Sequence, residues 1–153
     1  MYMKLTDNKD VSLQEVQING ETYFRISNVD KMRPFFMSIV SDSNHWMFIG
    51  SNGGLTAGRK DAENALFPYY TDDKIIESVE HTGSKSIFLV HSGDTHVWEP
   101  FSVWGASRYT ITRNLYKNLP GNKVLFEEIN HDLRLTYQYQ WNSCDSYGFI
   151  RKS

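Results

Sequence analysis

Residues 133–141 read LRLTYQYQW, and they alternate apolar and polar side chains more regularly than any other part of the chain. Successive side chains of an extended strand point to opposite faces, so one face would carry only apolar residues. These are Leu133, Leu135, Tyr137, Tyr139 and Trp141. Such alternation is typical of a strand that covers a hydrophobic core with one face and meets solvent with the other.

The flanking sequence repeats this rhythm of short strands and turns. Residues 11–18 and 22–26 flank Asn19-Gly20, a pair that favours a tight hairpin because both positions tolerate a positive φ angle. Turn residues separate the other predicted strands, which are residues 35–40, 46–50, 55–59, 86–91, 95–99, 109–116, 123–129 and 147–151. This spacing predicts an all-β fold, an antiparallel β-sandwich.

Residues 60–75 depart from the strand pattern. They mix aromatic and charged side chains without a period, which predicts one irregular loop or short helical turn. Long irregular loops in compact domains often carry function. We expect residues 1–10 to be a flexible N-terminus and residues 11–153 to form a single domain.

Charge and hydropathy exclude some classes of partner. The 153 residues carry a formal net charge of -2, which gives no general attraction to nucleic acid or to an anionic membrane surface. No apolar run approaches the roughly 18 residues of a membrane-spanning helix, and the first residues lack an apolar signal core. These features favour a cytoplasmic protein. Cys144 is the single cysteine, so no internal disulfide forms.

The residues that usually carry catalysis are scattered. The five histidines form no metal-binding motif, although His91 and His96 flank a predicted turn; ordinary strand positions are the favoured interpretation. Glycoside cleavage requires two carboxyl groups across one site. The acidic candidates are Asp72, Asp73, Glu99, Glu127, Glu128 and Asp132, and solvated acids are their default interpretation. We predict no catalytic residue, metal or cofactor for this chain.

Aromatic side chains are the stronger lead, since they make up 14% of the residues. Most serve as core packing in β-domains, whereas a row of exposed rings forms a platform for sugar rings or an interdomain face. The candidates at strand ends or in loops are Trp46, Trp98, Trp104, Tyr69 and Tyr70.

Two motifs resemble a known family. Residues 32–37, MRPFFM, and 46–59, WMFIGSNGGLTAGR, resemble the start of cellobiose-phosphorylase-like carbohydrate-active enzymes. The likeness continues through residues 64–74, 98–101 and 126–141, and it spans about residues 32–151. The resemblance implies an N-terminal β-supersandwich of the galactose-mutarotase-like kind, which packs on a separate (α/α)6 barrel that holds the catalytic acid. This sequence contains no such barrel, so no catalytic residue is carried over.

The resemblance leads to a functional expectation. We expect residues 11–153 to be the N-terminal part of a longer protein, a non-catalytic accessory domain of a glycoside phosphorylase or hydrolase that packs against the catalytic barrel. The family's sandwich is longer than this chain, so we expect an incomplete sandwich whose exposed edges favour homo-oligomers. The residues predicted to contact carbohydrate or the neighbouring domain are Trp46, Asn52, Arg59, Tyr69, Tyr70, Asp72 and Asp73.

Two alternatives stay open at this point. The first is a stand-alone carbohydrate-binding module whose aromatic rings stack on an oligosaccharide. The second is a small mutarotase-like enzyme, which would need His91 or His96 together with Glu99 in one cleft.

Overall fold

The computed structural model describes residues 10–66, 72–82 and 85–153, and it is built from three antiparallel sheets. The large sheet has six strands in the order β1-β2-β8-β9-β10-β11. Their bounds are β1 Ser12–Ile18, β2 Glu21–Ser27, β8 Ile111–Asn118, β9 Lys123–Asn130, β10 Leu135–Cys144 and β11 Gly148–Lys152. All five strand pairs in this sheet are antiparallel, as in a meander or Greek-key arrangement.

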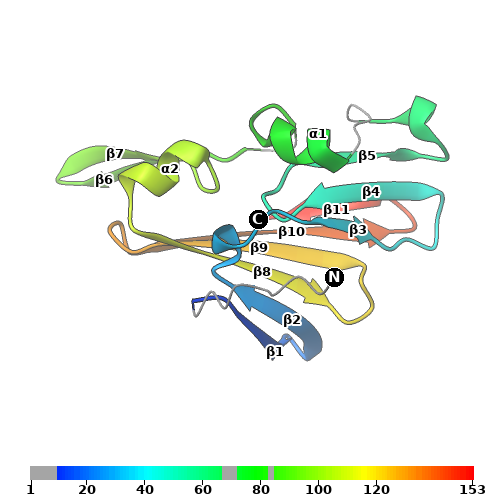
Figure 1. The fold of residues 1–153 in the computed structure, drawn as a ribbon, viewed down its shortest axis with the longest axis horizontal. Coiled ribbons are helices and arrows are strands. Elements are labelled where there is room, and N and C mark those ends of the chain that lie inside the picture. Colours follow the sequence, from blue (N-terminus) through cyan, green and yellow to red (C-terminus); the bar gives the residue numbers. More distant parts are fainter. Residues whose placement is uncertain (1–9, 67–71, 83–84) are drawn as a thin grey trace, which may run out of the picture.

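The chain between β2 and β8 forms the rest of the fold. A small sheet contains β3 Phe36–Ile39, β4 His45–Gly50 and β5 Leu55–Arg59, and β6 Phe88–Ser92 pairs with β7 Asp94–Trp98 in a separate hairpin. Figure 1 shows the small sheet stacked over the large one, with the β6–β7 hairpin at one end of the molecule. The prediction of an antiparallel all-β sandwich is therefore confirmed.

Short helical segments fill the connections. They are the α-helices α1 Asp72–Glu77 and α2 Val103–Arg108 and the 3-10 helices η1 Val29–Lys31, η2 Ala62–Asn64 and η3 Ser78–Glu80. Of these, η2 lies within the irregular region predicted over residues 60–75, and α1 begins in it but continues to Glu77. The sequence did not predict α2, whose N-cap Ser102 accepts a hydrogen bond from the backbone N–H of Gly105.

The hydrophobic core lies between the two stacked sheets. The small sheet contributes inward residues from each strand, and the large sheet contributes residues from β8, β9 and β10. Together with Val29 from η1, this cluster comprises Met37, Ile39, Met47, Ile49, Leu55, Ala57, Leu115, Val124, Phe126, Tyr139 and Trp141. The alternation predicted for residues 133–141 is confirmed from Tyr137 onward, because Tyr137 packs against this core and Tyr139 and Trp141 are buried in it. Leu135, on the same face, is 38% exposed, so its predicted place in the core is wrong.

Two local predictions are resolved by the backbone angles. Asn19 and Gly20 have φ angles of 52° and 80°, so the predicted hairpin turn between β1 and β2 is confirmed. The start of the predicted strand at residue 133 is wrong, because β10 begins at Leu135 and Arg134 has a φ angle of 54°. Leu133 and Arg134 instead form part of the turn between β9 and β10.

Candidate functional site

The small sheet brings two predicted site residues to the same end of the β4–β5 hairpin. Trp46 lies opposite Gly58 in the β4–β5 pair, and the exposed Arg59 is the next residue on β5. Asn52 lies in the turn that joins these strands at their other end. The predicted set is therefore divided between the two ends of one hairpin.

The outer face of the small sheet carries a row of three aromatic rings, which we call the aromatic strip: Phe36, Phe48 and Trp46. The ring centroids of Phe36 and Phe48 are 5.5 Å apart with an interplanar angle of 14°. Those of Phe48 and Trp46 are 6.0 Å apart at 35°. Met47 and Ile49 alternate with them on β4 and point into the core, which fixes the strip on the opposite face.

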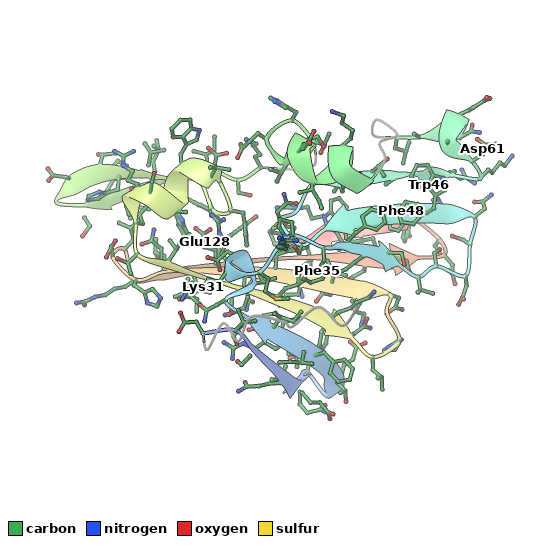
Figure 2. The ribbon with its side chains drawn as sticks, viewed as in Figure 1. Lys31, Phe35, Trp46, Phe48, Asp61 and Glu128 are labelled. Carbon is green, nitrogen blue, oxygen red and sulfur yellow. The ribbon has the colours of Figure 1, made fainter. Side chains whose placement is uncertain are left out.

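Gly58 leaves room for the indole of Trp46. A Cβ atom on Gly58 would lie 2.5 Å from Cζ2 of Trp46, so the six-membered ring of the indole covers the backbone of β5 at this residue. The indole Nε1 donates a hydrogen bond of 3.2 Å to the backbone carbonyl of Asp61. Figure 2 shows Trp46 and Phe48 along β4, with Asp61 beyond the end of the sheet. These contacts hold the ring in one orientation.

Asn52 has a structural role in its turn. Its Nδ2 donates to the carbonyl of Ile76 in α1 at 2.9 Å, while its Oδ1 accepts from the backbone N–H of Gly54 at 3.2 Å. Asn52 thereby attaches α1 to the small sheet. It also lines two cavities, of about 40 Å³ and about 140 Å³, on either side of Phe101. The smaller has room for a few water molecules.

The four remaining predicted site residues belong to the loop before α1 and to the start of that helix. Tyr69 and Tyr70 lie outside the described residues. Asp72 and Asp73 are the first two residues of α1. The predicted contacts of these two tyrosines and two aspartates with carbohydrate or a neighbouring domain therefore stay predictions.

Phe101 packs against β9 and β10 of the large sheet at the margin of the core. Its φ angle of 65° is unusual for a bulky side chain. Its ring packs edge-on against Tyr139 with a centroid distance of 5.2 Å, and its backbone N–H donates to Glu128 at 2.7 Å. These contacts stabilise the strained backbone between the β6–β7 hairpin and the large sheet.

Glu128 is fully buried and accepts two further hydrogen bonds besides that from Phe101. The indole Nε1 of Trp98 donates at 2.9 Å, and Nε of Arg113 donates at 2.8 Å in an ion pair. Arg113 also donates from Nη2 to the carbonyl of Ser102 at 2.7 Å. This cluster binds the segment after β7 to the centre of the large sheet.

Glu127, the preceding residue, faces the other side of the sheet. It accepts hydrogen bonds from Asn114, Tyr116 and Gln138 at 2.7, 2.9 and 2.5 Å. Glu127 and Glu128 thus lie on opposite faces and cannot serve one site, and the default interpretation of both as solvated acids is wrong, because both are buried. Burial and the contact with Glu127 raise the pKa of Tyr116 to about 12, because both disfavour the phenolate.

The lining of the smaller cavity includes an ion-pair network. Lys85 contacts Glu80 at 2.5 Å and Glu99 at 3.1 Å. The hydrogen bond from Lys85 lowers the pKa of Glu80, and the same contact raises the pKa of Lys85. The carboxylate of Glu99 is thus paired with the ammonium group of Lys85.

Tyr137 also lines this cavity. Burial favours the neutral phenol, but hydrogen bonds with Ser153, Ser86 and Arg151 outweigh it, and the pKa of Tyr137 is lowered. The Arg151 guanidinium donates to the Tyr137 hydroxyl at 3.0 Å and lies 4.5 Å from the centroid of the Tyr139 ring. This polar cluster links β10 and β11 to the base of the β6–β7 hairpin.

The histidines occupy ordinary strand positions. His91 lies opposite Thr95 and forms a hydrogen bond of 3.0 Å with it, whereas His96 lies opposite Val90, so the two imidazoles are on different faces of the hairpin. Within the described ranges, no three His, Cys, Asp or Glu side chains gather around a possible metal position.

The candidate tryptophans differ in exposure. Trp98 is 2% exposed and belongs to the core, which is the role expected for most aromatic residues of the chain. Trp104 on α2 is 79% exposed. The β6–β7 hairpin also presents an outward row of Ile87, Leu89 and Val97, which we call the hairpin face; Leu89 and Val97 are direct cross-strand neighbours, and all three are exposed.

The geometry defines the class of this chain as a two-layered antiparallel β-domain with an aromatic strip and an apolar hairpin face. No protein-family model and no curated protein matches its sequence. In the part of the chain that the structure describes, no helix is both long and apolar enough to cross a membrane.

Proposed function

We propose that this chain is a non-catalytic accessory domain of a carbohydrate-active enzyme and that it packs against a helical catalytic barrel. The observation that carries the proposal is the β6–β7 hairpin, which has apolar side chains on both faces. Phe88 and Trp98 pack inward, with centroid distances of 5.2 and 6.5 Å to the ring of Tyr137. The outward hairpin face consists of Ile87, Leu89 and Val97.

Apolar residues on both faces are typical of strands covered on both sides. An exposed apolar patch on a folded domain usually marks an interaction surface. Trp104 and Val103 on α2, which follows β7, add to the exposed apolar residues at this end of the molecule. A large rigid surface such as an (α/α)6 barrel is a suitable partner, and the sequence resemblance supports this choice.

Binding to an isolated barrel tests the proposal. The probe is the (α/α)6 domain of a cellobiose-phosphorylase-like enzyme produced without its own β-domain. We expect a one-to-one complex by light scattering, and we expect Leu89→Asp to abolish it because an aspartate would be buried unpaired at the interface. Leu13→Asp is the matched control, since Leu13 on β1 is 68% exposed and Leu89 is 65% exposed.

The outcomes separate clearly. If the unchanged chain does not bind the barrel, the proposed function is wrong. If Leu89→Asp and Leu13→Asp both bind the barrel as tightly as the unchanged chain, the hairpin face is not the docking surface. Light scattering of the chain alone also tests homo-oligomers. A dimer that Leu89→Asp converts to a monomer would place a second copy of the chain, rather than a barrel, on the hairpin face.

A further inference from the structure

The larger of the two cavities beside Phe101 leads from the surface into the core. It has a volume of about 140 Å³. Its lining combines the exposed Asp30 and Pro34 with Asn114 and Phe126, which are each 1% exposed. Protein interiors are normally packed with few voids larger than a water molecule. A cavity of roughly 150 Å³ is large enough to hold a benzene molecule, so this one has room for a small organic ligand.

Much of the cavity wall is apolar. Phe101 and Phe126 both line it, and their rings meet edge-on with a centroid distance of 6.2 Å and an interplanar angle of 84°. A flat ring beside such a pair can stack on one aromatic face and contact the edge of the other ring, and both arrangements are favourable. Val29 from η1 and Met32, whose flexible thioether adapts to irregular shapes, also belong to the wall. In Figure 2, Lys31 and Phe35 mark the two ends of the segment that contains Met32.

Arg113 contributes a hydrogen-bond donor to the lining. Its Nε donates to Glu128, and its Nη2 donates to the carbonyl of Ser102. Among the residues that the structure describes, its Nη1 has no hydrogen-bond partner. Because Glu128 already neutralises the guanidinium, and because Asp30 adds a negative group to the lining, the cavity favours a neutral acceptor over an anion.

Ser51 supplies a second donor from a buried position. It is 8% exposed, and its Oγ accepts a hydrogen bond of 3.1 Å from the backbone N–H of Phe35. A hydroxyl group can donate one hydrogen bond in addition to those it accepts. Over the described ranges of the chain, the Ser51 hydroxyl donates to no acceptor. A carbonyl oxygen in the cavity would supply the missing acceptor.

The strained backbone of Phe101 belongs to the same wall. A φ angle of 65° is rare for an aromatic residue, and strained residues gather at ligand sites where the surrounding contacts hold them in place. Here the backbone N–H of Phe101 is bonded to Glu128, and its ring packs against Tyr139. The aromatic part of the wall is therefore formed before any ligand binds, which lowers the entropic cost of binding.

We propose that this cavity binds a small neutral molecule that combines a flat apolar ring with one carbonyl group. The ring packs against Phe101 and Phe126, and the carbonyl oxygen accepts hydrogen bonds from Ser51 and Arg113. Benzamide is a simple representative of this class. The site goes beyond the proposed accessory role and does not rest on it, because the hairpin face contributes no residue to the cavity.

Titration of the whole chain with benzamide, followed by two-dimensional amide NMR, tests the site. We expect the largest shifts at residues of the lining such as Asn52, Phe101 and Asn114. Benzoate and benzene are the comparison probes. Each should bind about fivefold more weakly than benzamide or worse, because benzoate adds a negative charge near Asp30 and benzene offers no acceptor to Ser51.

Ser51→Ala should weaken the binding of benzamide about fivefold through the loss of one hydrogen bond. Ser102→Ala is the matched control and should leave binding unchanged. Ser102 is 5% exposed, and its Oγ also accepts one hydrogen bond from a backbone N–H, that of Gly105, but it does not line this cavity. Val29→Phe places a ring in the cavity and should abolish binding, and the amide spectrum itself reports whether this variant folds.

Three results would overturn the proposal. Benzamide at millimolar concentration shifts no resonance of the lining, benzoate or benzene binds as tightly as benzamide, or Ser51→Ala and Ser102→Ala weaken binding equally.

Discussion

Replacing Glu128 by glutamine should destabilise the protein far more than the same change at Glu127. Glu128 is fully buried and receives hydrogen bonds from Trp98, Phe101 and Arg113. A glutamine keeps the shape but supplies only one acceptor oxygen, and its NH2 group must then face one of these donors. The positive charge of Arg113 also loses its partner.

The contacts give the magnitude. Breaking a buried ion pair by removing one partner costs about 3–5 kcal/mol. Arg113 retains 16% exposure of its side chain and its hydrogen bond to Ser102, so the lower end, about 3 kcal/mol, applies. For a chain of 153 residues this loss corresponds to a decrease in Tm of roughly 6–12 °C. Since small domains have stabilities of about 5–15 kcal/mol, the variant should still fold.

Urea denaturation followed by circular dichroism measures the effect. At Glu127 the three donors are uncharged and the Tyr116 hydroxyl can rotate to accept a hydrogen bond, so Glu127→Gln should cost only about 1 kcal/mol. Arg113→Met combined with Glu128→Gln should cost less than the sum of the single changes. A Glu128→Gln loss no larger than that of Glu127→Gln would refute the importance of the ion pair.

Two further changes test the packing. Gly54→Ala should lower the free energy of unfolding by about 2 kcal/mol, because the added Cβ would lie 2.1 Å from the carbonyl oxygen of Ile75. Thermal unfolding measures this loss, and Gly93→Asn is the control because a Cβ at Gly93 would meet no atom within 4 Å. The Tyr116 phenol, with its pKa raised from 10.0 to about 12, should ionise late in a near-ultraviolet pH titration. Tyr116→Phe should reduce the amplitude of that late phase without removing it, because burial and Glu21 also raise the pKa of Tyr23 to about 12. Its contribution to stability should be complete below pH 10 and be lost as the pH rises from 10 to about 12.

The strands were predictable because their signals are local. A hairpin turn such as Asn19-Gly20 specifies its own backbone angles, and the two flanking strands then pair without reference to the rest of the chain. The β4–β5 and β6–β7 hairpins follow the same logic. In contrast, α2 has only six residues and one capping signal, Ser102, which is too little for a periodic pattern.

The aromatic strip was only partly predictable. Trp46 was identified from the sequence, and strand alternation also places Phe48 on its face. The third ring, Phe36, joins them through the register in which Phe36 pairs with Gly50 and Ser38 with Phe48. That register depends on core packing of Met37 and Ile39, which no short sequence pattern specifies.

The Glu128 cluster shows the same limit at longer range. Its donors Arg113, Phe101 and Trp98 are 15, 27 and 30 residues away in the sequence. Their meeting depends on the β8–β9 register, which sets Arg113 opposite Glu128, and on the path of the segment after β7. Composition alone presents Glu128 as one more surface acid.

The buried carboxylate also determines how the hairpin face is presented. Among the described strands, β6 and β7 pair only with each other, so no ladder of backbone hydrogen bonds fixes this hairpin to either larger sheet. Its attachment relies on side chains: Trp98 bonded to Glu128, and the rings of Phe88 and Trp98 packed against Tyr137. Glu128 therefore links the stability of the large sheet to the orientation of Leu89 and Val97. An interaction surface held in this way depends on a buried polar contact at the centre of the fold, and a change there should weaken partner binding without touching the interface.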